Sequence, residues 1–182
     1  MTDHFAEQLV PHEVRAQYVA EITALALYGM EQYASHDGMI EPVYQISIWT
    51  DVEAAFSAIN FETKEHAQES VNQSVQWWLE RGNVEEAQRS SSEPYNGNPQ
   101  DFKYKRFTEA SHPALVAAIG SIELMETIQR ALETELAVRL LEVVEKLIVS
   151  PEFEKLPKEP TVYIGVSSPD DWYDHIRVWT AD

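Results

Sequence analysis

The N-terminal part of the chain alternates between a helical and an extended pattern of hydrophobic residues. Helical spacing predicts an amphipathic helix over residues 12–22, with an apolar stripe of Val14, Tyr18, Val19 and Ile22. The continuous apolar run 23–30 predicts a strand buried on both faces, although periodicity alone does not distinguish such a run from a buried helix. Alternation over residues 43–49 predicts a second strand, and a polar turn centred on Asp37-Gly38 predicts that the two strands form a hairpin.

The middle of the chain is predicted to be mainly helical. Asp51 can cap a short helix over residues 52–60, whose acidic first turn favours the positive end of the helix dipole. A longer helix, ended by Gly82, is expected over residues 62–81, with an apolar stripe of Ala67, Val71, Val75, Trp78 and Leu79. The Ser- and Pro-rich segment 90–101 predicts a loop, and the alternating residues 101–107 fit either a strand or a short helix.

The strongest helical pattern in the chain covers residues 114–149. A straight helix of that length would measure ~54 Å at 1.5 Å per residue, so we expect a break at Gly120-Ser121 with Ser121 as a new N-cap. The three prolines of residues 151–160 predict an irregular tether. Strands are predicted over residues 161–167 and 175–180, separated by a turn at Pro169-Asp170-Asp171.

These elements predict a single α+β domain over residues 1–182. An antiparallel sheet of about four strands is expected, made of residues 23–30, 43–49, 161–167 and 175–180. The helix over residues 121–149 and the helix over residues 12–22 are expected to cover mainly one face of it. A chain of 182 residues buries about 70% of its unfolded surface, which favours one compact domain.

The charge of the chain is strongly negative and unevenly distributed. Its 31 acidic and 13 basic residues give a net charge of −18, and residues 1–63 contain ten carboxylates and a single Arg15. Binding to nucleic acid or to an anionic membrane requires clustered cations, and the only basic cluster consists of Lys103, Lys105 and Arg106. The charge therefore argues against nucleic-acid and membrane partners and would steer a basic partner toward the N-terminal third.

The absence of cysteine excludes several classes of site. Without cysteine the chain has no disulfide framework, no thiolate metal site and no cysteine nucleophile, which fits a reducing cytoplasm. The sequence begins without the basic and apolar segments of a secretory signal, and no stretch reaches the ~20 apolar residues of a membrane span. The phosphate-loop, GxGxxG, GxSxG, HExxH and EF-hand motifs are absent as well, and we expect no cofactor.

Two groups of residues could carry metal or acid–base chemistry. Glu62, His66 and Glu69 would share one face of the helix predicted over residues 62–81, where they could hold a divalent metal. A solvated helix face explains the same spacing. Near the C-terminus, the carboxylates of residues 170–174 precede His175 and could orient it for base catalysis, but Pro-Asp-Asp is also ordinary turn chemistry.

Aromatic residues are candidates for binding. Trp77 and Trp78 would point about 100° apart on a helix, so only one of them can be central to the core. Other large aromatic side chains lie in the predicted loop and near the C-terminus: Tyr95, Trp172, Tyr173 and Trp179. Exposed Trp and Tyr are favoured interface anchors, although packing at the edge of the core explains them equally.

The order of these elements resembles that of a known protein family. The resemblance rests on Leu27-Tyr28, Trp49-Thr50-Asp51-Val-Glu, Asp101-Phe-Lys-Tyr and Thr161-Val-Tyr-Ile-Gly-Val-Ser-Ser-Pro-Asp-Asp. The chain is similar in layout to a bacterial domain family of unknown function, some of whose members resemble immunity proteins of toxin systems. The resemblance implies a small intracellular α+β protein and transfers no catalytic residue. The last strand ends at Trp179-Thr180, earlier than this family implies.

Two functions follow from these observations. The first is a non-enzymatic, cytoplasmic binding protein of the immunity type, which would occlude a basic protein partner; a homodimer is compatible with it. Trp172 would anchor this interface, and its carboxylates would be Glu31, Asp37, Glu41, Asp170, Asp171 and Asp174. The alternative is a metal-dependent hydrolase that uses His66 or His175 with nearby carboxylates.

Overall fold

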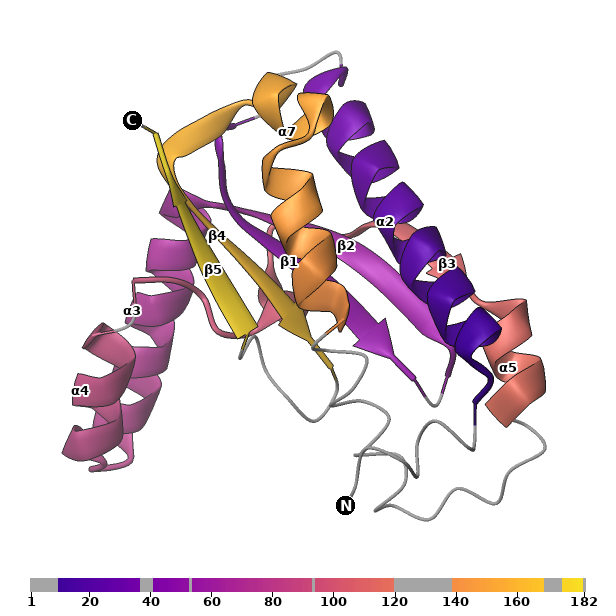
Figure 1. Ribbon diagram of the computed structural model, residues 1–182. Coiled ribbons are helices and arrows are strands. Elements are labelled where there is room, and N and C mark those ends of the chain that lie inside the picture. Colours follow the sequence, from indigo (N-terminus) through magenta and orange to yellow (C-terminus); the bar gives the residue numbers. More distant parts are fainter. Residues whose placement is uncertain are drawn as a thin grey trace.

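The structure is a computed structural model that describes residues 10–36, 41–52, 54–92, 94–119, 139–168 and 175–181. Within these residues the chain forms a five-stranded sheet with helices on both sides (Figure 1). The strands are β1 (Val43–Asp51), β2 (Phe56–Thr63), β3 (Tyr104–Ser111), β4 (Lys158–Ser167) and β5 (His175–Thr180). Their order is β3-β2-β1-β4-β5, with β1 and β4 parallel and all other neighbours antiparallel. The predicted α+β class is confirmed.

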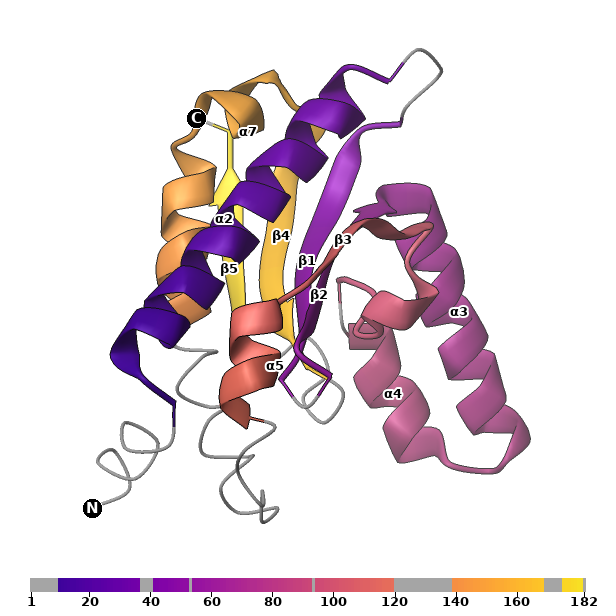
Figure 2. The ribbon, with the colours of Figure 1, turned by 90° about the vertical axis from the view of Figure 1, so that its right-hand side faces the viewer.

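Two groups of helices lie on opposite sides of the sheet (Figure 2). α2 (His12–Ala34), a helix over residues 139–148 and the short α7 (Pro151–Lys155) lie on one side. α3 (Lys64–Glu80) and α4 (Val84–Ser92) form a helical hairpin on the other side, and α5 (Pro113–Ile119) packs beside α2. No helix in the described part of the chain is long and apolar enough to cross a membrane.

The hydrophobic core lies between α2, the 139–148 helix and the sheet. Along α2 the buried side chains recur every three or four residues, at Tyr18, Ile22, Ala26, Met30 and Tyr33. Ile46 and Ile48 of β1 belong to this core, as do side chains of the neighbouring strands. Because side chains alternate along a strand, Gln45 and Ser47 point to the other face, toward the α3–α4 hairpin.

The strand expected over residues 23–30 is wrong, because this run continues α2. The buried positions Ile22, Ala26 and Met30 are four residues apart, so the stripe that begins in the first turns of α2 continues to its end. Tyr28, in the middle of the run, is 53% exposed, whereas a strand buried on both faces would hide it. The expected hairpin between residues 23–30 and 43–49 is therefore also wrong, and its turn residue Asp37 lies outside the described residues.

The helix expected over residues 52–60 is wrong as well. Asp51 accepts a hydrogen bond from the Ala54 backbone N–H, as a helix cap would, but Ala55 has a φ of 45° and the chain reverses into β2. β2 pairs with both β1 and β3, so its backbone groups are satisfied by strands instead of by a helix. β2 and β3 are the two strands that the expected four-stranded sheet omits.

Other predictions are confirmed or refined. The helix expected over residues 62–81 is α3, and Gly82 follows it with a φ of 72°. Residues 43–49, 161–167 and 175–180 are strands, and of the two options for residues 101–107 the strand β3 is present. The expected tether 151–160 is wrong: Ser150 caps α7 by accepting from Phe153 N–H, and β4 begins at Lys158.

The long helical pattern over residues 114–149 is described only at its two ends. α5 ends at Ile119, and the helix over residues 139–148 supplies the buried side chains Leu140, Val143, Val144 and Leu147. The break expected at Gly120-Ser121 lies outside the described residues. The described end of the helix lies on the same side of the sheet as α2 (Figure 2), as predicted.

Candidate functional site

A cleft of about 1150 Å³ opens between the α3–α4 hairpin and the segment 95–105, and we call it the hairpin cleft. α3 contributes His66, Glu69 and the pair Trp77 and Trp78 to its lining. α4 contributes Arg89, and the opposite wall includes Tyr95, Asn98, Asp101, Lys103 and Lys105. The lining thus combines aromatic rings with charged and amide groups, as binding sites do.

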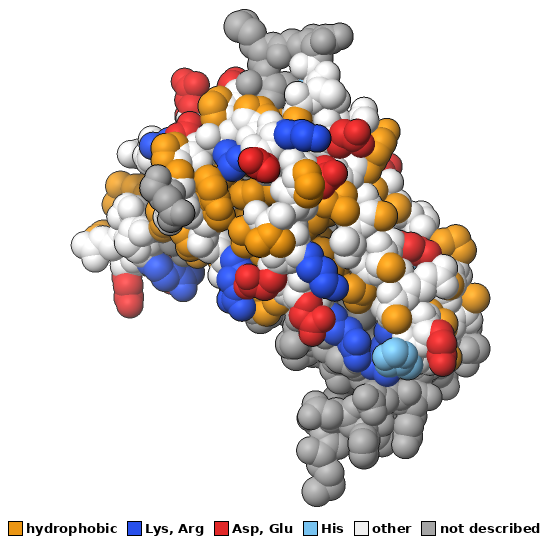
Figure 3. Space-filling view, turned by 45° about the horizontal axis from the view of Figure 1, so that its top comes forward, with side chains coloured by type: hydrophobic (Ala, Val, Ile, Leu, Met, Phe, Trp, Pro, Cys, Tyr) orange, Lys and Arg blue, Asp and Glu red, His pale blue; other side chains and the backbone are white. Residues whose placement is uncertain are grey.

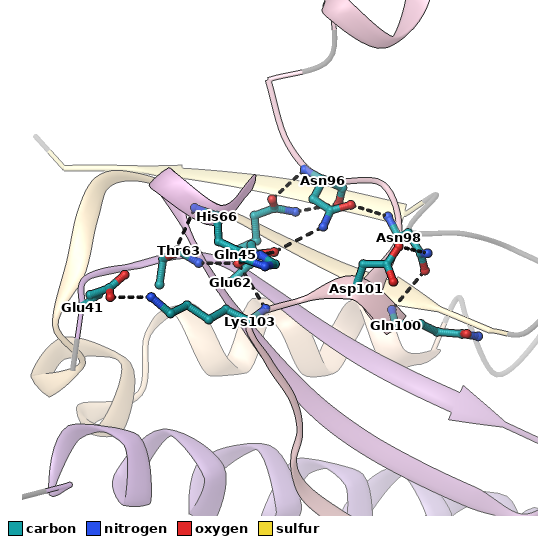
Figure 4. Close-up of polar contacts among 10 residues, drawn as sticks. All are labelled: Glu41, Gln45, Glu62, Thr63, His66, Asn96, Asn98, Gln100, Asp101 and Lys103. Carbon is teal, nitrogen blue, oxygen red and sulfur yellow. Dashed lines mark hydrogen bonds and ion pairs between the residues drawn. The ribbon is translucent and has the colours of Figure 1, made fainter. Parts of the chain in front are cut away.

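A fully buried carboxylate, Glu62, organises the base of this cleft (Figure 4). Glu62 is the last residue but one of β2, and its oxygens accept hydrogen bonds from the backbone N–H groups of Thr63 at 2.9 Å and Lys103 at 3.3 Å. Asn96 Nδ2 donates to Glu62 Oε2 at 3.2 Å, and His66 Nδ1 lies 2.9 Å from the same oxygen. These contacts compensate the cost of burying the charge.

The segment after α4 is bound to the sheet through Gln45. Gln45 Oε1 accepts from the Asn96 N–H at 2.7 Å, and Gln45 Nε2 donates to the Asn96 carbonyl at 3.0 Å. Asn96 Oδ1 in turn accepts from the Asn98 N–H at 3.0 Å, next to the short 3₁₀ helix η1 (Pro99–Asp101). The loop expected over residues 90–101 is partly regular, because α4 extends to Ser92 and η1 begins at Pro99. The buried polar groups of Asn96 hold this segment as one wall of the cleft.

Of the predicted metal group, His66 and Glu69 line the cleft, and His66 is the one held by a buried carboxylate. The β2–α3 junction brings Glu62 and His66 together, and Nδ1 bound to the carboxylate leaves Nε2 without a partner among the described residues. A carboxylate-oriented imidazole can act as a general base or as a metal ligand. Glu69 lines the same cleft, but the described residues contain no group of three or more His, Asp or Glu side chains that could hold a metal ion.

The two adjacent tryptophans lie in the cleft instead of the core. Trp77 is 46% exposed and Trp78 is half-buried, and their rings are perpendicular with centroids 4.4 Å apart. The Arg81 guanidinium carbon lies 3.8 Å from the centroid of the Trp77 ring. Of the apolar stripe predicted for this helix only Ala67 is buried, because most of α3 packs against α4 and projects from the sheet (Figure 1).

A second cavity of about 430 Å³ adjoins the hairpin cleft and shares Lys105 with it. Its walls include the rings of Trp49 and Phe56, whose centroids are 5.9 Å apart. The guanidinium carbon of Arg106 lies 4.9 Å from the Phe56 centroid, and Arg106 also pairs with Glu109. Two members of the only basic cluster in the sequence thus line this cavity.

Two of the seven predicted binding residues are described, and they differ in environment. Glu31 is exposed on α2, whereas Glu41 pairs with Lys103, and this hydrogen bond holds the pKa of Glu41 below its usual value of 4.5. The other five lie outside the described residues: Asp37, Asp170, Asp171, Trp172 and Asp174. The structure therefore does not bring the predicted surface together in its described part.

The described residues next to Glu41 and those that precede position 169 lie at opposite ends of the sheet. Glu41 precedes Val43, which pairs with Lys158 at the start of β4, while residues 169–174 follow Ser167, which pairs with Trp49 at the far end of β1. Six residues of strand separate Val43 from Trp49, about 20 Å at 3.3 Å per residue.

On the face shown in Figure 3, acidic and basic side chains lie next to each other around a central group of hydrophobic side chains.

A buried group that the sequence analysis missed has the connectivity of a catalytic triad. His112 Nε2 lies 3.0 Å from Ser57 Oγ, and His112 Nδ1 lies 2.7 Å from Glu21 Oε2. Burial acts to raise the pKa of Glu21, but hydrogen bonds from His112 and Gln17 outweigh it and the pKa is lowered. Ser57 and His112 are fully buried, so in this structure the group joins α2, β2 and the start of α5 and offers no access to a substrate. The three residues are far apart in the sequence, which contains no local signal for them.

In comparisons with known proteins, no family model matches the chain, and no curated protein or solved structure is significantly similar to it.

Proposed function

We propose that this protein is a non-enzymatic binding module of the immunity type, which neutralises or regulates a basic protein partner in the bacterial cytoplasm. The hairpin cleft carries this proposal, because it exposes Trp77 beside Trp78 on a wall that faces a segment held by buried polar groups. Exposed tryptophans set in a rigid frame are favoured anchors of protein interfaces. The cytoplasmic location rests on the lack of cysteine.

The net charge of −18 supports a basic partner. Opposite charges raise the association rate most, while contacts in the cleft would determine the lifetime of the complex. The predicted acidic residues Glu31, Asp170, Asp171 and Asp174 remain part of the proposal as an outer surface that attracts the partner. Occlusion by contact is a sufficient mechanism for such a protein and requires no catalytic group.

The test starts with the tagged chain as bait in a lysate of its native host. We expect a basic protein that is retained in low salt, is released in high salt and binds the purified chain with a salt-dependent Kd. Trp77→Ala should weaken that binding at least tenfold, as interface anchors do, while Val116→Ala, an exposed apolar position on α5, should leave it unchanged. Absence of any partner at either salt would contradict the proposal.

The acidic outer surface needs a separate experiment. Charge reversal of Asp170, Asp171 and Asp174 should slow association with the captured partner and leave the dissociation rate nearly unchanged, because such residues act mainly by steering. Stopped-flow measurement at two salt concentrations separates the two rates. An association rate equal to that of the wild type would remove this surface from the proposal while leaving the cleft in place.

One observation favours a second function, a hydrolase that uses His66. Glu62 orients the imidazole of His66, and His66 lines the hairpin cleft. A metal-dependent form of this enzyme predicts that Mn²⁺, Mg²⁺ or Zn²⁺ raises the Tm of the wild type and not that of His66→Ala. No rise in Tm with any of these ions, together with metal-free purified protein, would reject the metal-dependent enzyme.

A further inference from the structure

We propose that the hairpin cleft receives an arginine side chain of the partner, whose guanidinium stacks on the tryptophan pair and is attracted by the carboxylates of Glu69 and Asp101. This inference rests on the proposed function and specifies the chemistry of its interface. It follows from the charges left unpaired in the cleft, from the geometry of the aromatic rings and from the rigidity of the opposite wall.

The first argument is the balance of unpaired charge in the cleft. Of the cations in its described lining, Arg89 pairs with Glu86 and Lys103 pairs with Glu41, and both of these carboxylates lie outside the lining. Lys105 is then the one cation of that lining without a carboxylate among the described residues.

The acidic residues of the lining remain available. The Glu69 side chain makes no hydrogen bond or ion pair with another described residue, and the Asp101 side chain accepts only from the amide of Asn98. The lining has three basic residues and two carboxylates, but two of its cations are neutralised by Glu86 and Glu41, so its unpaired groups are two carboxylates and Lys105. The cleft therefore complements a cation.

The second argument is the chemistry of the rings. The guanidinium carbon of the exposed residue Arg81 already lies 3.8 Å from the centroid of the Trp77 ring. Trp77 stays 46% exposed despite this contact, and Trp78 and Tyr95 add further aromatic surface to the cleft. Arginine fits such a site better than lysine, because its flat guanidinium stacks on rings and bonds carboxylates with two parallel N–H groups.

One wall of the cleft is fixed before a ligand binds. The segment that carries Tyr95 and Asp101 is bound to β1 through the paired hydrogen bonds of Gln45 and Asn96 and to β2 through Glu62. A site that is rigid before binding loses little conformational entropy when its ligand arrives. The cleft is therefore suited to hold one side chain in a defined position.

Peptide titrations test the inference without an identified partner. The intact chain is titrated with hexa-arginine, hexa-lysine and hexa-glutamate peptides, and binding is followed by tryptophan fluorescence and calorimetry. We expect hexa-arginine to bind about tenfold more tightly than hexa-lysine, because stacking on exposed rings distinguishes the two cations. Hexa-glutamate should not bind. Equal affinities for the arginine and lysine peptides would overturn the inference.

A charge-matched pair of variants separates the cleft from the general negative field. The double variant E69Q/D101N should lower the affinity for hexa-arginine about tenfold, whereas E80Q/E85Q removes the same charge from exposed positions of the same helical hairpin that do not line the cleft. Circular dichroism checks that both variants fold. Equal losses of affinity in the two variants would overturn the inference, because binding would then follow net charge alone.

The outcome also distinguishes the inference from the function on which it rests. If a host partner binds E69Q/D101N as tightly as the wild type, the protein is a binding module that uses another surface, and the arginine site is rejected. If hexa-arginine binds as expected and no host partner exists, the arginine site stands while the proposed function fails.

Discussion

At the scale of single residues, Glu62 has the most demanding environment in the described chain. Its carboxylate is fully buried and is surrounded by two backbone N–H groups, the amide of Asn96 and the imidazole of His66. Burying a carboxylate without these donors would lower the free energy of unfolding by several kcal/mol. Glu62 therefore joins β2, α3 and the segment that begins at Asn96, and it determines the shape of the cleft.

We expect Glu62→Gln to lower the free energy of unfolding by about 1.5–3 kcal/mol, the range for hydrogen bonds to charged groups. The glutamine keeps the volume but replaces one acceptor oxygen by an NH₂ group that faces other donors. Urea denaturation followed by fluorescence measures the loss. Glu80→Gln is the control, since Glu80 is exposed, and should change the free energy by less than about 0.5 kcal/mol. Equal effects in the two variants would contradict this account.

The Glu41–Lys103 pair gives a pH-dependent prediction. Their hydrogen bond lowers the pKa of Glu41 below 4.5 and raises the pKa of Lys103 above 10.5. A carboxyl group whose pKa is lowered by folding stabilises the folded state fully at pH values above its pKa in the unfolded chain. This contribution is lost as the pH falls through its pKa in the folded state. We expect Glu41→Gln to cost about 0.2–1 kcal/mol at pH 7, because the pair is exposed.

The difference between Glu41→Gln and the wild type should shrink as the pH falls from 4.5 and vanish below the lowered pKa of Glu41, where the carboxyl group is protonated in the folded state too. Chemical denaturation across this pH range measures it. Glu31→Gln removes an exposed carboxylate from α2 and is the control for the loss of one negative charge. A difference that persists after Glu41 is protonated would show that the ion pair is not its cause.

At the scale of elements, α2 and β3 approach each other closely at Gly29. A Cβ atom at this position would lie 2.7 Å from Thr108 Oγ1, well inside contact distance. Thr108 is held near α2, with its hydroxyl 3.5 Å from the Leu25 carbonyl. Glycine is thus required inside this helix by packing, although it is a poor helix former.

We expect Gly29→Ala to destabilise the protein by about 1–3 kcal/mol, as overpacking does. In a Thr108→Ala background the same change should instead stabilise it by up to about 1 kcal/mol, because only the helix propensity of alanine then remains. A double-mutant cycle measured by thermal denaturation tests this reversal of sign. Destabilisation of equal size in both backgrounds would mean that Thr108 is not the obstacle.

Prediction of elements from the sequence succeeded where local patterns were sufficient. Alternation identified β1, and helical periodicity with a terminal glycine identified α3. It failed for residues 23–30, whose pattern fits both a helix and a strand, and for residues 52–60, where a cap at Asp51 predicted a helix. Strand pairing decided the structure of residues 56–60, because β2 forms backbone hydrogen bonds with both β1 and β3. For residues 23–30, burial of one stripe against the sheet decided in favour of the helix.

At the scale of the whole molecule, the net charge of −18 is the dominant property. Repulsion among the carboxylates opposes the compact state, and salt screens it. We expect the Tm to rise when NaCl increases from about 0.01 M to about 0.1 M, over which the Debye length falls from ~30 Å to ~10 Å. Differential scanning calorimetry measures this shift. A falling Tm would mean that ion pairs such as Arg177–Glu145 outweigh the repulsion.

The candidate site was only partly accessible to sequence analysis. The spacing of Glu62 and His66 predicted that the two lie together on a helix face, whereas the pair spans the junction between β2 and α3. Trp77 and Trp78 were candidates for binding, but no local pattern places them in one cleft with Tyr95 and Asp101. Those residues meet because the chain reverses after α3 and again after α4.

By itself the sequence determined the α+β class, α3, the strands β1, β4 and β5 and the excess of negative charge, because periodicity, turn residues and composition are local or additive properties. Only the tertiary structure decided that residues 23–30 are helical and that β2 and β3 complete the sheet. It alone joined Glu62 to Asn96 and Ser57 to His112. Strand pairing and the satisfaction of buried polar groups depend on contacts between residues distant in the chain, which no local pattern encodes.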